Sequence, residues 1–276
     1  MAQAPERGDT AVLTGHSGVH TGVVSGMGGV GKTQVALDYA HRLWAAGEVE
    51  LWVWVTASSR ETIVSSFARL ATDLTGVEEP DPENGARRLL EWLSTASARW
   101  LVVLDDVHSP ADLSGLWPPA TTCGRVLVTT RRRDAALREH GRCLVEVDVF
   151  TPQEAEGYLR ASLAEQPHLV AGAAELAVEL GCLPLALAQA AAYMLDRHLS
   201  CAAYQVRLVE RRLASVVPEP DALPDEHRAT VAATWSLSLQ QADRLVPEGV
   251  ARPLLEVASV LDANGIPLGC SSHPPC

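Results

Sequence analysis

The chain has 276 residues, 47% of them hydrophobic and 20% charged, which is enough for one large domain or two ordinary ones with a sizeable core. The formal net charge of −12 argues against a general nucleic-acid surface, because phosphate contacts need a basic face. The longest apolar stretch, Leu180 to Leu195, is interrupted by Pro184 and Gln189 and is too short to span a bilayer. We therefore expect a globular protein without a signal segment, membrane contact or nucleic-acid partner.

The cysteines show neither C-x-x-C spacing nor the density of a disulfide scaffold. We expect reduced thiols, as in a cytoplasmic protein. The six residues are Cys123, Cys143, Cys182, Cys201, Cys270 and Cys276.

The first predicted elements enclose a phosphate-binding loop. Residues 1–20 have little apolar periodicity and predict a loose leader or the remnant of a preceding linker. Gly22–Ser25 is an apolar strand candidate, and apolar spacing predicts a helix from Lys32 to Trp44. The pattern G-x-x-x-x-G-K-T lies between them, in the strand-to-helix context that it requires. Its residues are Gly26, Met27, Gly28, Gly29, Val30, Gly31, Lys32 and Thr33.

This loop predicts a site for nucleotide phosphates. Its glycines let backbone N–H groups point at phosphate oxygens, and the helix N-terminus adds the positive end of a dipole. Lys32 would reach the β- and γ-phosphates, and the Thr33 hydroxyl would bind Mg²⁺. Lys32 is the only lysine, because the other 21 basic residues are arginines. A slim ammonium thus occurs where a planar guanidinium would not fit the loop. The alternative interpretation, a Gly-rich turn before an ordinary helix, would not require a lysine at this position.

Strands and helices alternate over residues 22–149 and predict a doubly wound parallel α/β domain, residues 21–150. The segment Trp100–Asp106 is a continuous apolar run that ends in two aspartates, typical of a strand buried on both faces. The other expected strands are Glu50–Thr56, Gly124–Thr130 and Cys143–Val149, and the expected helices are Glu61–Thr75 and Asn84–Ala96.

Beyond residue 150 only helical periods occur, which predicts a small all-α domain over residues 151–216. A proline-rich acidic linker follows at residues 217–226, and residues 227–276 hold two further helices. The expected helices are Gln153–Ala164, Val170–Glu179, Leu185–Arg197, Ala202–Ala214, His227–Arg244 and Val250–Leu261.

Two aspartates at the end of the buried strand are the candidates for metal binding and catalysis. Ligands of open α/β sheets bind at the carboxyl ends of the strands, which is where Asp105 and Asp106 stand. We assign Mg²⁺ to Asp105, and we assign polarisation of the water that attacks the γ-phosphate to Asp106. The alternative is a strand end that points to solvent.

Arg131 follows the strand Gly124–Thr130 and is the candidate for sensing the γ-phosphate. Arg132 and Arg133 continue the run, so a solvated arginine loop is the alternative. His108, shortly after the aspartates, is interpreted as an exposed turn residue rather than a catalytic one.

With these motifs in place, residues 22–262 resemble the NB-ARC family of STAND-class P-loop NTPases, in the form common in actinobacteria. The loop at residues 26–33 is similar to Walker A, and residues 101–107, L-V-V-L-D-D-V, are similar to Walker B. Residues 125–131, R-V-L-V-T-T-R, resemble the sensor strand. Residues 181–187, G-C-L-P-L-A-L, resemble the G-L-P-L-A motif, and residues 233–239 resemble the start of a winged-helix region.

The resemblance implies an ADP-bound resting state, exchange for ATP on stimulation, slow hydrolysis, and contact between Pro184 and the nucleotide. It also implies a protein partner or self-association on activation. The chain departs from the family at Cys182, which replaces a glycine, and in lacking the upstream F-x-G-R element. The winged-helix region is incomplete, so we expect a truncated product.

Two functions of different classes follow. One is a cytoplasmic ATP/ADP switch with slow, Mg²⁺-dependent hydrolysis. The other is a nucleotide-binding or protein-interaction fragment that does not hydrolyse ATP. A metabolic P-loop kinase or hydrolase ranks last, because no lid or acceptor residues are evident.

Overall fold

The computed structural model describes residues 21–139, 141–214 and 226–259. The described residues form two compact units, which divide between Asp148 and Val149. The expected leader at residues 1–20, residues 217–225 of the expected linker and the chain beyond residue 259 lie outside the described residues.

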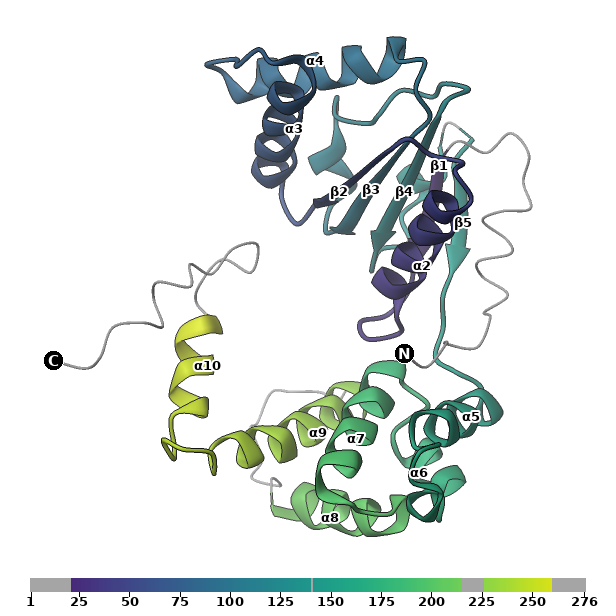
Figure 1. The fold of residues 1–276 in the computed structure, drawn as a ribbon, viewed down its shortest axis with the longest axis vertical. Helices are drawn as coiled ribbons and strands as arrows, with labels where there is room; N and C mark the ends of the chain where they lie inside the picture. Colours follow the sequence, from purple (N-terminus) through teal and green to yellow (C-terminus); the bar gives the residue numbers. More distant parts are fainter. Residues whose placement is uncertain (1–20, 140, 215–225, 260–276) are drawn as a thin grey trace, which may run out of the picture. The chain divides into compact units, whose positions relative to one another are not determined.

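The first unit is built on a five-stranded parallel sheet in the order β2-β3-β4-β1-β5 (Figure 1). This arrangement confirms the predicted α/β fold class, with the phosphate-loop strand β1 inside the sheet. The strands are β1 (Thr21–Ser25), β2 (Leu51–Thr56), β3 (Trp100–Val107), β4 (Gly124–Thr130) and β5 (Cys143–Glu146), and the helices are α2 (Lys32–Ala45), α3 (Arg60–Thr75) and α4 (Pro82–Thr95).

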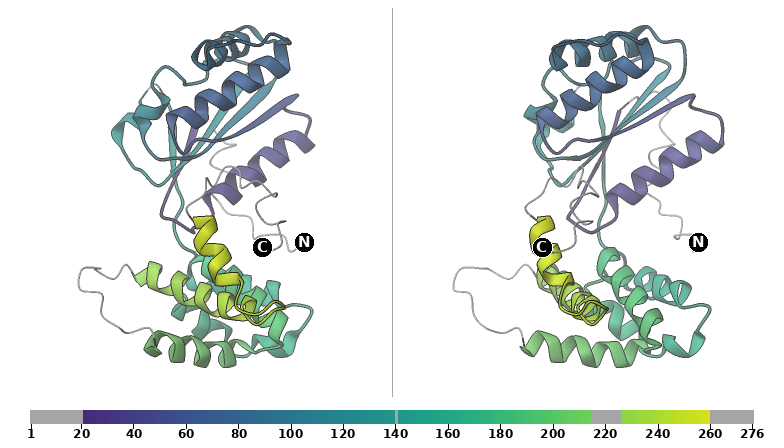
Figure 2. Two further views of the ribbon diagram at one scale, coloured as in Figure 1. Left: turned by 90° about the vertical axis from the view of Figure 1, so that its left-hand side faces the viewer. Right: turned by 60° about the vertical axis from the view of Figure 1, so that its left-hand side comes forward.

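Alternation along the strands separates two packed faces. Val53 and Val55 of β2 join a core cluster with Phe67 of α3 and Leu89 of α4. The intervening Trp52 points the other way, and its ring makes an edge contact with His41 of α2 at a centroid distance of 5.0 Å. Accordingly, α2 and the α3–α4 pair cover opposite faces of the sheet (Figure 2). Helices on both faces explain why β3 is apolar along most of its length.

Several helix boundaries differ from the prediction because a capping residue precedes a proline. The Asp81 side chain accepts a hydrogen bond from Glu83 N, and Pro82 occupies the first turn, so α4 begins two residues before the expected Asn84.

One strand boundary also differs from the prediction, because β5 ends at Glu146 rather than at Val149.

The second unit contains only helices among its described residues. Gly172, with φ of 87°, separates a short 3₁₀ turn, η3 (Pro167–Val170), from α6, so the single helix expected over Val170–Glu179 is wrong at its start. The helices are α5 (Pro152–Ser162), α6 (Ala173–Glu179), α7 (Pro184–Arg197), α8 (Cys201–Ala214), α9 (Glu226–Ala242) and α10 (Ala251–Ser259).

In the described part of the chain, no helix combines the length and the apolar character that crossing a membrane requires.

The packing of Trp100 on Gly124 generates a stability prediction. The two residues are directly opposite in the β3–β4 register, and a Cβ on Gly124 would lie 2.1 Å from Cζ2 of the buried indole. We expect Gly124→Ala to lower the free energy of unfolding by about 1–3 kcal/mol through overpacking. Urea unfolding followed by circular dichroism measures the change.

Gly157→Ala is the matched control, because this glycine lies inside α5 and a Cβ there meets nothing within 4 Å. It should raise the stability by roughly 0.5–1 kcal/mol. Equal effects of the two substitutions would contradict the steric explanation.

Candidate functional site

The phosphate-binding loop joins β1 to α2 and needs glycine for two separate reasons. Gly26 packs so closely on the chain after β5 that a Cβ would lie 2.2 Å from the carbonyl oxygen of Val147. Gly31 has φ of 95° at the N-cap of α2, a left-handed conformation that side chains disfavour. The loop conformation therefore follows from the glycine positions of the motif.

The N-terminus of α2 differs from those of α3, α4 and α5. The side chains of Ser59, Asp81 and Thr151 cap α3, α4 and α5, and each of these helices has an acidic residue in its first turn. α2 has neither a side-chain cap nor an acidic residue there. Its first-turn N–H groups are thus available to an anion, which the helix dipole also favours.

Lys32, at the start of α2, is only 7% exposed, and its ammonium donates a hydrogen bond to the Met27 carbonyl oxygen at 2.8 Å. Burial lowers the pKa of Lys32, and the charge of Arg131 lowers it further, whereas Asp106 and Asp105 act in the opposite direction. Two cations and two carboxylates therefore influence one another at the loop. Phosphate oxygens would relieve the repulsion between the cations.

An extra residue in β3 places both aspartates at this loop. Leu104 is opposite Val128 and Val107 is opposite Thr130, so three steps along β3 match two along β4. Asp106 adopts a left-handed conformation with φ of 59°, which Asp tolerates better than most residues. Its backbone N–H donates to Thr129 Oγ1 at 2.8 Å, which fixes the bulge.

Asp105 connects β3 to the phosphate-binding loop. Its Oδ1 accepts hydrogen bonds from the hydroxyls of Thr33 at 3.0 Å and Thr129 at 2.5 Å. A hydroxyl and a carboxylate are oxygen ligands of the kind that Mg²⁺ takes, together with phosphate oxygens and water. Among the described residues no group of three or more His, Cys, Asp or Glu could hold a metal ion, so a divalent ion here would depend on the phosphates. These residues fit a phosphate-bound Mg²⁺.

Asp106 and Arg131 also meet at this edge. Arg131 Nε lies 3.8 Å from Asp106 Oδ1, and the guanidinium lies beside Gly28, where a Cβ would be 3.5 Å from Nη1. The other two arginines of the run form ion pairs elsewhere, Arg132 with Asp134 and Arg133 with Glu146. Of the three, Arg131 alone thus pairs with a carboxylate of the candidate site.

Sequence reasoning missed two side chains that hold the aspartates. Thr129 bridges Asp105 and Asp106 from β4, and its position opposite the bulge leaves no trace in the sequence pattern. His108 is 55% exposed, as expected for a turn residue, yet its Nε2 lies 3.2 Å from Asp106 Oδ2. The sequence D-D-V-H of residues 105–108 was the signal that could have indicated this contact, because it places an imidazole two residues after the Asp106 carboxylate.

The Pro184 motif lies in the helical unit. Pro184 occupies the first turn of α7, and the preceding Cys182 has a left-handed φ of 53°. The Cys182 carbonyl accepts a hydrogen bond from Phe150 N at 3.1 Å, so this loop anchors the segment that enters α5. The contact between Pro184 and a nucleotide stays a prediction.

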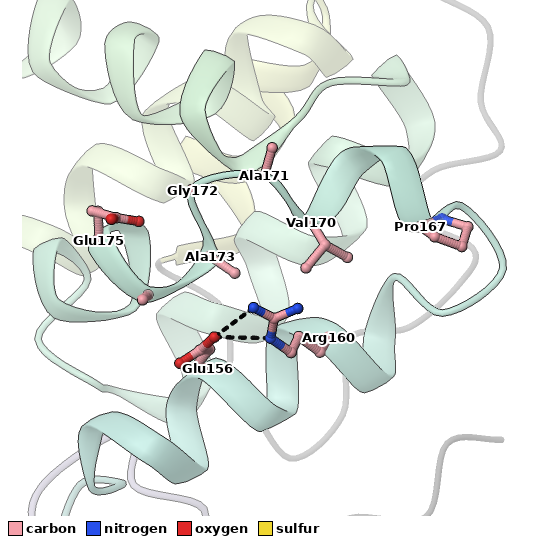
Figure 3. A pocket seen from close by; sticks show the side chains of 9 residues that line it. Glu156, Arg160, Pro167, Val170, Ala171, Gly172, Ala173 and Glu175 are labelled. Carbon is pink, nitrogen blue, oxygen red and sulfur yellow. Dashed lines mark hydrogen bonds and ion pairs between the residues drawn. The ribbon is translucent and has the colours of Figure 1, made fainter.

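A pocket of about 390 Å³ lies in the helical unit between α5 and the start of α6 (Figure 3). The ion pair of Arg160 with Glu156, at 2.7 Å, occupies one side of it. None of the predicted site residues lines this pocket, so it is not part of the candidate site.

Comparisons with known proteins show which proteins the chain resembles. The chain is 31% identical over 238 residues to "Regulatory protein AfsR" of Streptomyces griseus, covering 80% of this chain and 22% of that protein. It is 24% identical over 229 residues to "Disease resistance RPP8-like protein 3" of Arabidopsis thaliana, covering 79% of this chain and 25% of that protein. The chain therefore spans about a fifth to a quarter of the length of these relatives.

Among solved structures, the crystal structure of Cdc6p from Pyrobaculum aerophilum matches with a TM-score of 0.48 and 16% identity, covering 72% of this chain and 64% of that one. The family model "NB-ARC domain" matches residues 12–166, which is more than half of the chain and includes the whole phosphate-binding loop and both aspartates. An NB-ARC phosphate-binding loop implies nucleotide binding, and this chain belongs to the NB-ARC family.

Proposed function

We propose that the chain is the nucleotide-operated switch of a STAND-type signalling regulator, which binds ATP and ADP with Mg²⁺ and hydrolyses ATP slowly. The observation that carries the proposal is the convergence of Lys32, Thr33, Asp105, Asp106 and Arg131 on one edge of the parallel sheet. These residues supply the cations, the metal ligands and the carboxylate that phosphoryl transfer to water needs.

The binding half of the proposal rests on the loop and α2. Backbone N–H groups of the loop, including those of Met27, Gly29 and Val30, together with the uncapped start of α2, would bind the phosphates. Thr33 and Asp105 would hold Mg²⁺, which supplies charge neutralisation at the phosphates when bound. Pro184 would contact the nucleotide from the helical unit.

The hydrolytic half rests on Asp106. This carboxylate would accept a hydrogen bond from the attacking water, whose oxygen forms a bond to the γ-phosphorus as the bond to the β–γ bridging oxygen breaks. Products are ADP and phosphate, and the water proton leaves through Asp106. Arg131 would stabilise charge on the γ-phosphate oxygens.

The relatives' printed names, which describe a regulator and a disease-resistance protein, support the proposed role in signalling. A partner protein or a second copy of the regulator would read the nucleotide state, in the cytoplasm. The conformational element would be the all-α domain of residues 151–216, together with the winged-helix-like region that follows it.

A binding-only module is the second candidate. Both oxygens of Asp106 lie near groups that carry or can acquire positive charge, which favours nucleotide retention without turnover. Single-turnover hydrolysis with excess Mg²⁺ distinguishes the candidates, because the module would return its ATP unchanged.

Replacing the only lysine tests binding. Lys32→Met should raise the Kd for ATP and ADP about 10- to 100-fold, because charge-assisted hydrogen bonds to phosphate are lost. Without nucleotide, its melting temperature should be no lower than that of the wild type, because a buried, destabilised charge is removed. Calorimetry measures the Kd. A thermal-shift assay measures the melting temperature without nucleotide and its increase when nucleotide is added.

Arg133→Met controls for the loss of one positive charge near the site and should bind nucleotide like the wild type. Lys32 also carries the only side-chain amine of the chain. Bound nucleotide should therefore protect Lys32 from an acylating reagent, and mass spectrometry measures the extent of acylation. Equal affinity in Lys32→Met and the wild type would disprove the assignment of the phosphate site.

Asp106→Asn tests turnover, since Asn keeps the size of Asp and tolerates the left-handed backbone. We expect single-turnover hydrolysis to fall about 10²- to 10⁴-fold, the usual contribution of a general base, while ATP affinity is kept. Radiolabelled ATP gives the required sensitivity. Asp134→Asn, which alters the Arg132 ion pair instead, should hydrolyse at the wild-type rate. Full activity of Asp106→Asn would refute the role of this carboxylate.

A further inference from the structure

His108 joins the end of β3 to the loop that follows β2. Its Nδ1 lies 2.9 Å from the carbonyl oxygen of Ser58, and its Nε2 lies 3.2 Å from Asp106 Oδ2. The ring thus spans two strand ends, with one nitrogen on each. Both partners are acceptors, which restricts the protons that the ring can carry.

A carbonyl oxygen only accepts hydrogen bonds, so Nδ1 of His108 must carry a hydrogen to bind Ser58. In a neutral ring Nε2 would then be an acceptor that faces a carboxylate oxygen, which is repulsive. The contact with Asp106 becomes a hydrogen bond when Nε2 is also protonated. The geometry therefore offers each ring nitrogen one acceptor, a carbonyl at Nδ1 and a carboxylate at Nε2.

The Ser58 anchor is itself fixed by its neighbours. Ala57 N donates to the Asp105 carbonyl oxygen at 2.7 Å, continuing the pairing of β2 with β3. On the other side, the Ser59 hydroxyl caps α3 by accepting from Thr62 N. Because backbone contacts hold this carbonyl, a ring bound to it has a defined position.

Asp106 is held differently at its two oxygens. Oδ2 contacts His108 at 3.2 Å, whereas Oδ1 is 3.8 Å from Arg131 Nε, too far for a hydrogen bond. Arg131 is 62% exposed at its side chain and has room to approach the carboxylate. A direct Asp106–Arg131 pair would occupy both groups that the hydrolytic reaction needs.

We propose that His108 is a positioning residue, which holds Asp106 by Nε2 and keeps it from closing onto Arg131. The carboxylate then stays directed at the attacking water, and the guanidinium stays available to the γ-phosphate. This proposal rests on the proposed function, in which Asp106 and Arg131 act on the γ-phosphate and its water. His108 itself touches neither.

Three substitutions separate the two ring contacts. His108→Gln keeps a donor where Nε2 reaches Asp106, His108→Asn keeps one where Nδ1 reaches Ser58, and His108→Ala keeps neither. We expect single-turnover hydrolysis to fall about tenfold in the Asn and Ala variants, the effect of one charge-assisted hydrogen bond, and to recover in the Gln variant. The Kd for ATP should stay at the wild-type value in all three.

Two kinetic outcomes overturn the proposal. Recovery with Asn and not with Gln would make His108 an anchor of the Ser58 loop only. Wild-type rates in all three variants would remove any role in turnover.

A second measurement does not depend on hydrolysis. In ¹⁵N spectra of the full chain, His108 signals are assigned by their loss in His108→Gln. Asp106→Asn should move the Nε2 resonance from its protonated toward its unprotonated position, while Nδ1–H is retained. An unchanged Nε2 resonance overturns the proposal. If the wild type does not hydrolyse ATP, the proposed function fails, and this spectrum still decides whether His108 holds Asp106.

Discussion

In a regular strand, Asp105 and Asp106 would point to opposite faces of the sheet, and only one could reach the phosphate-binding loop. One extra residue in β3, opposite Thr129, removes this restriction. Asp105 then bonds to Thr33 at the start of α2, and Asp106 lies by Arg131 at the end of β4. The Thr129 hydroxyl stabilises the arrangement by donating to one aspartate and accepting from the other. The remaining site geometry depends on this bulge.

Much of the fold could be predicted because its signals are local. Apolar runs such as Trp100–Asp106 marked buried parallel strands, and glycine spacing marked the loop, since Gly31 must adopt a left-handed conformation. Helix ends were predicted less well. Pro82 lies inside the first turn of α4, two residues before the expected start at Asn84, because Asp81 supplies the cap. Gly172 likewise shortens α6, because its left-handed backbone conformation is incompatible with a right-handed helix.

The finer geometry of the site could not be predicted, because it depends on register between strands far apart in the sequence. Thr129 reads as an ordinary strand residue until the shift between β3 and β4 places it against both aspartates. His108 reads as a turn residue, and only the position of the Ser58 carbonyl, 50 residues earlier, turns it toward Asp106. The left-handed backbone of Cys182, between α6 and α7, was missed for a different reason, because glycine ordinarily occupies such a position.

The bulge also determines which changes in the gene the site tolerates. A substitution at Asp105 or Asp106 removes one functional group and leaves its neighbours in place. Deletion of a single residue between Leu104 and Val107 would restore regular alternation and turn one carboxylate to the opposite face of the sheet. The same deletion would also shift His108 by one position along the chain, away from the Ser58 carbonyl. The number of residues in β3 is therefore under constraint independently of their identity, and divergence here should proceed by replacement rather than by changes in length.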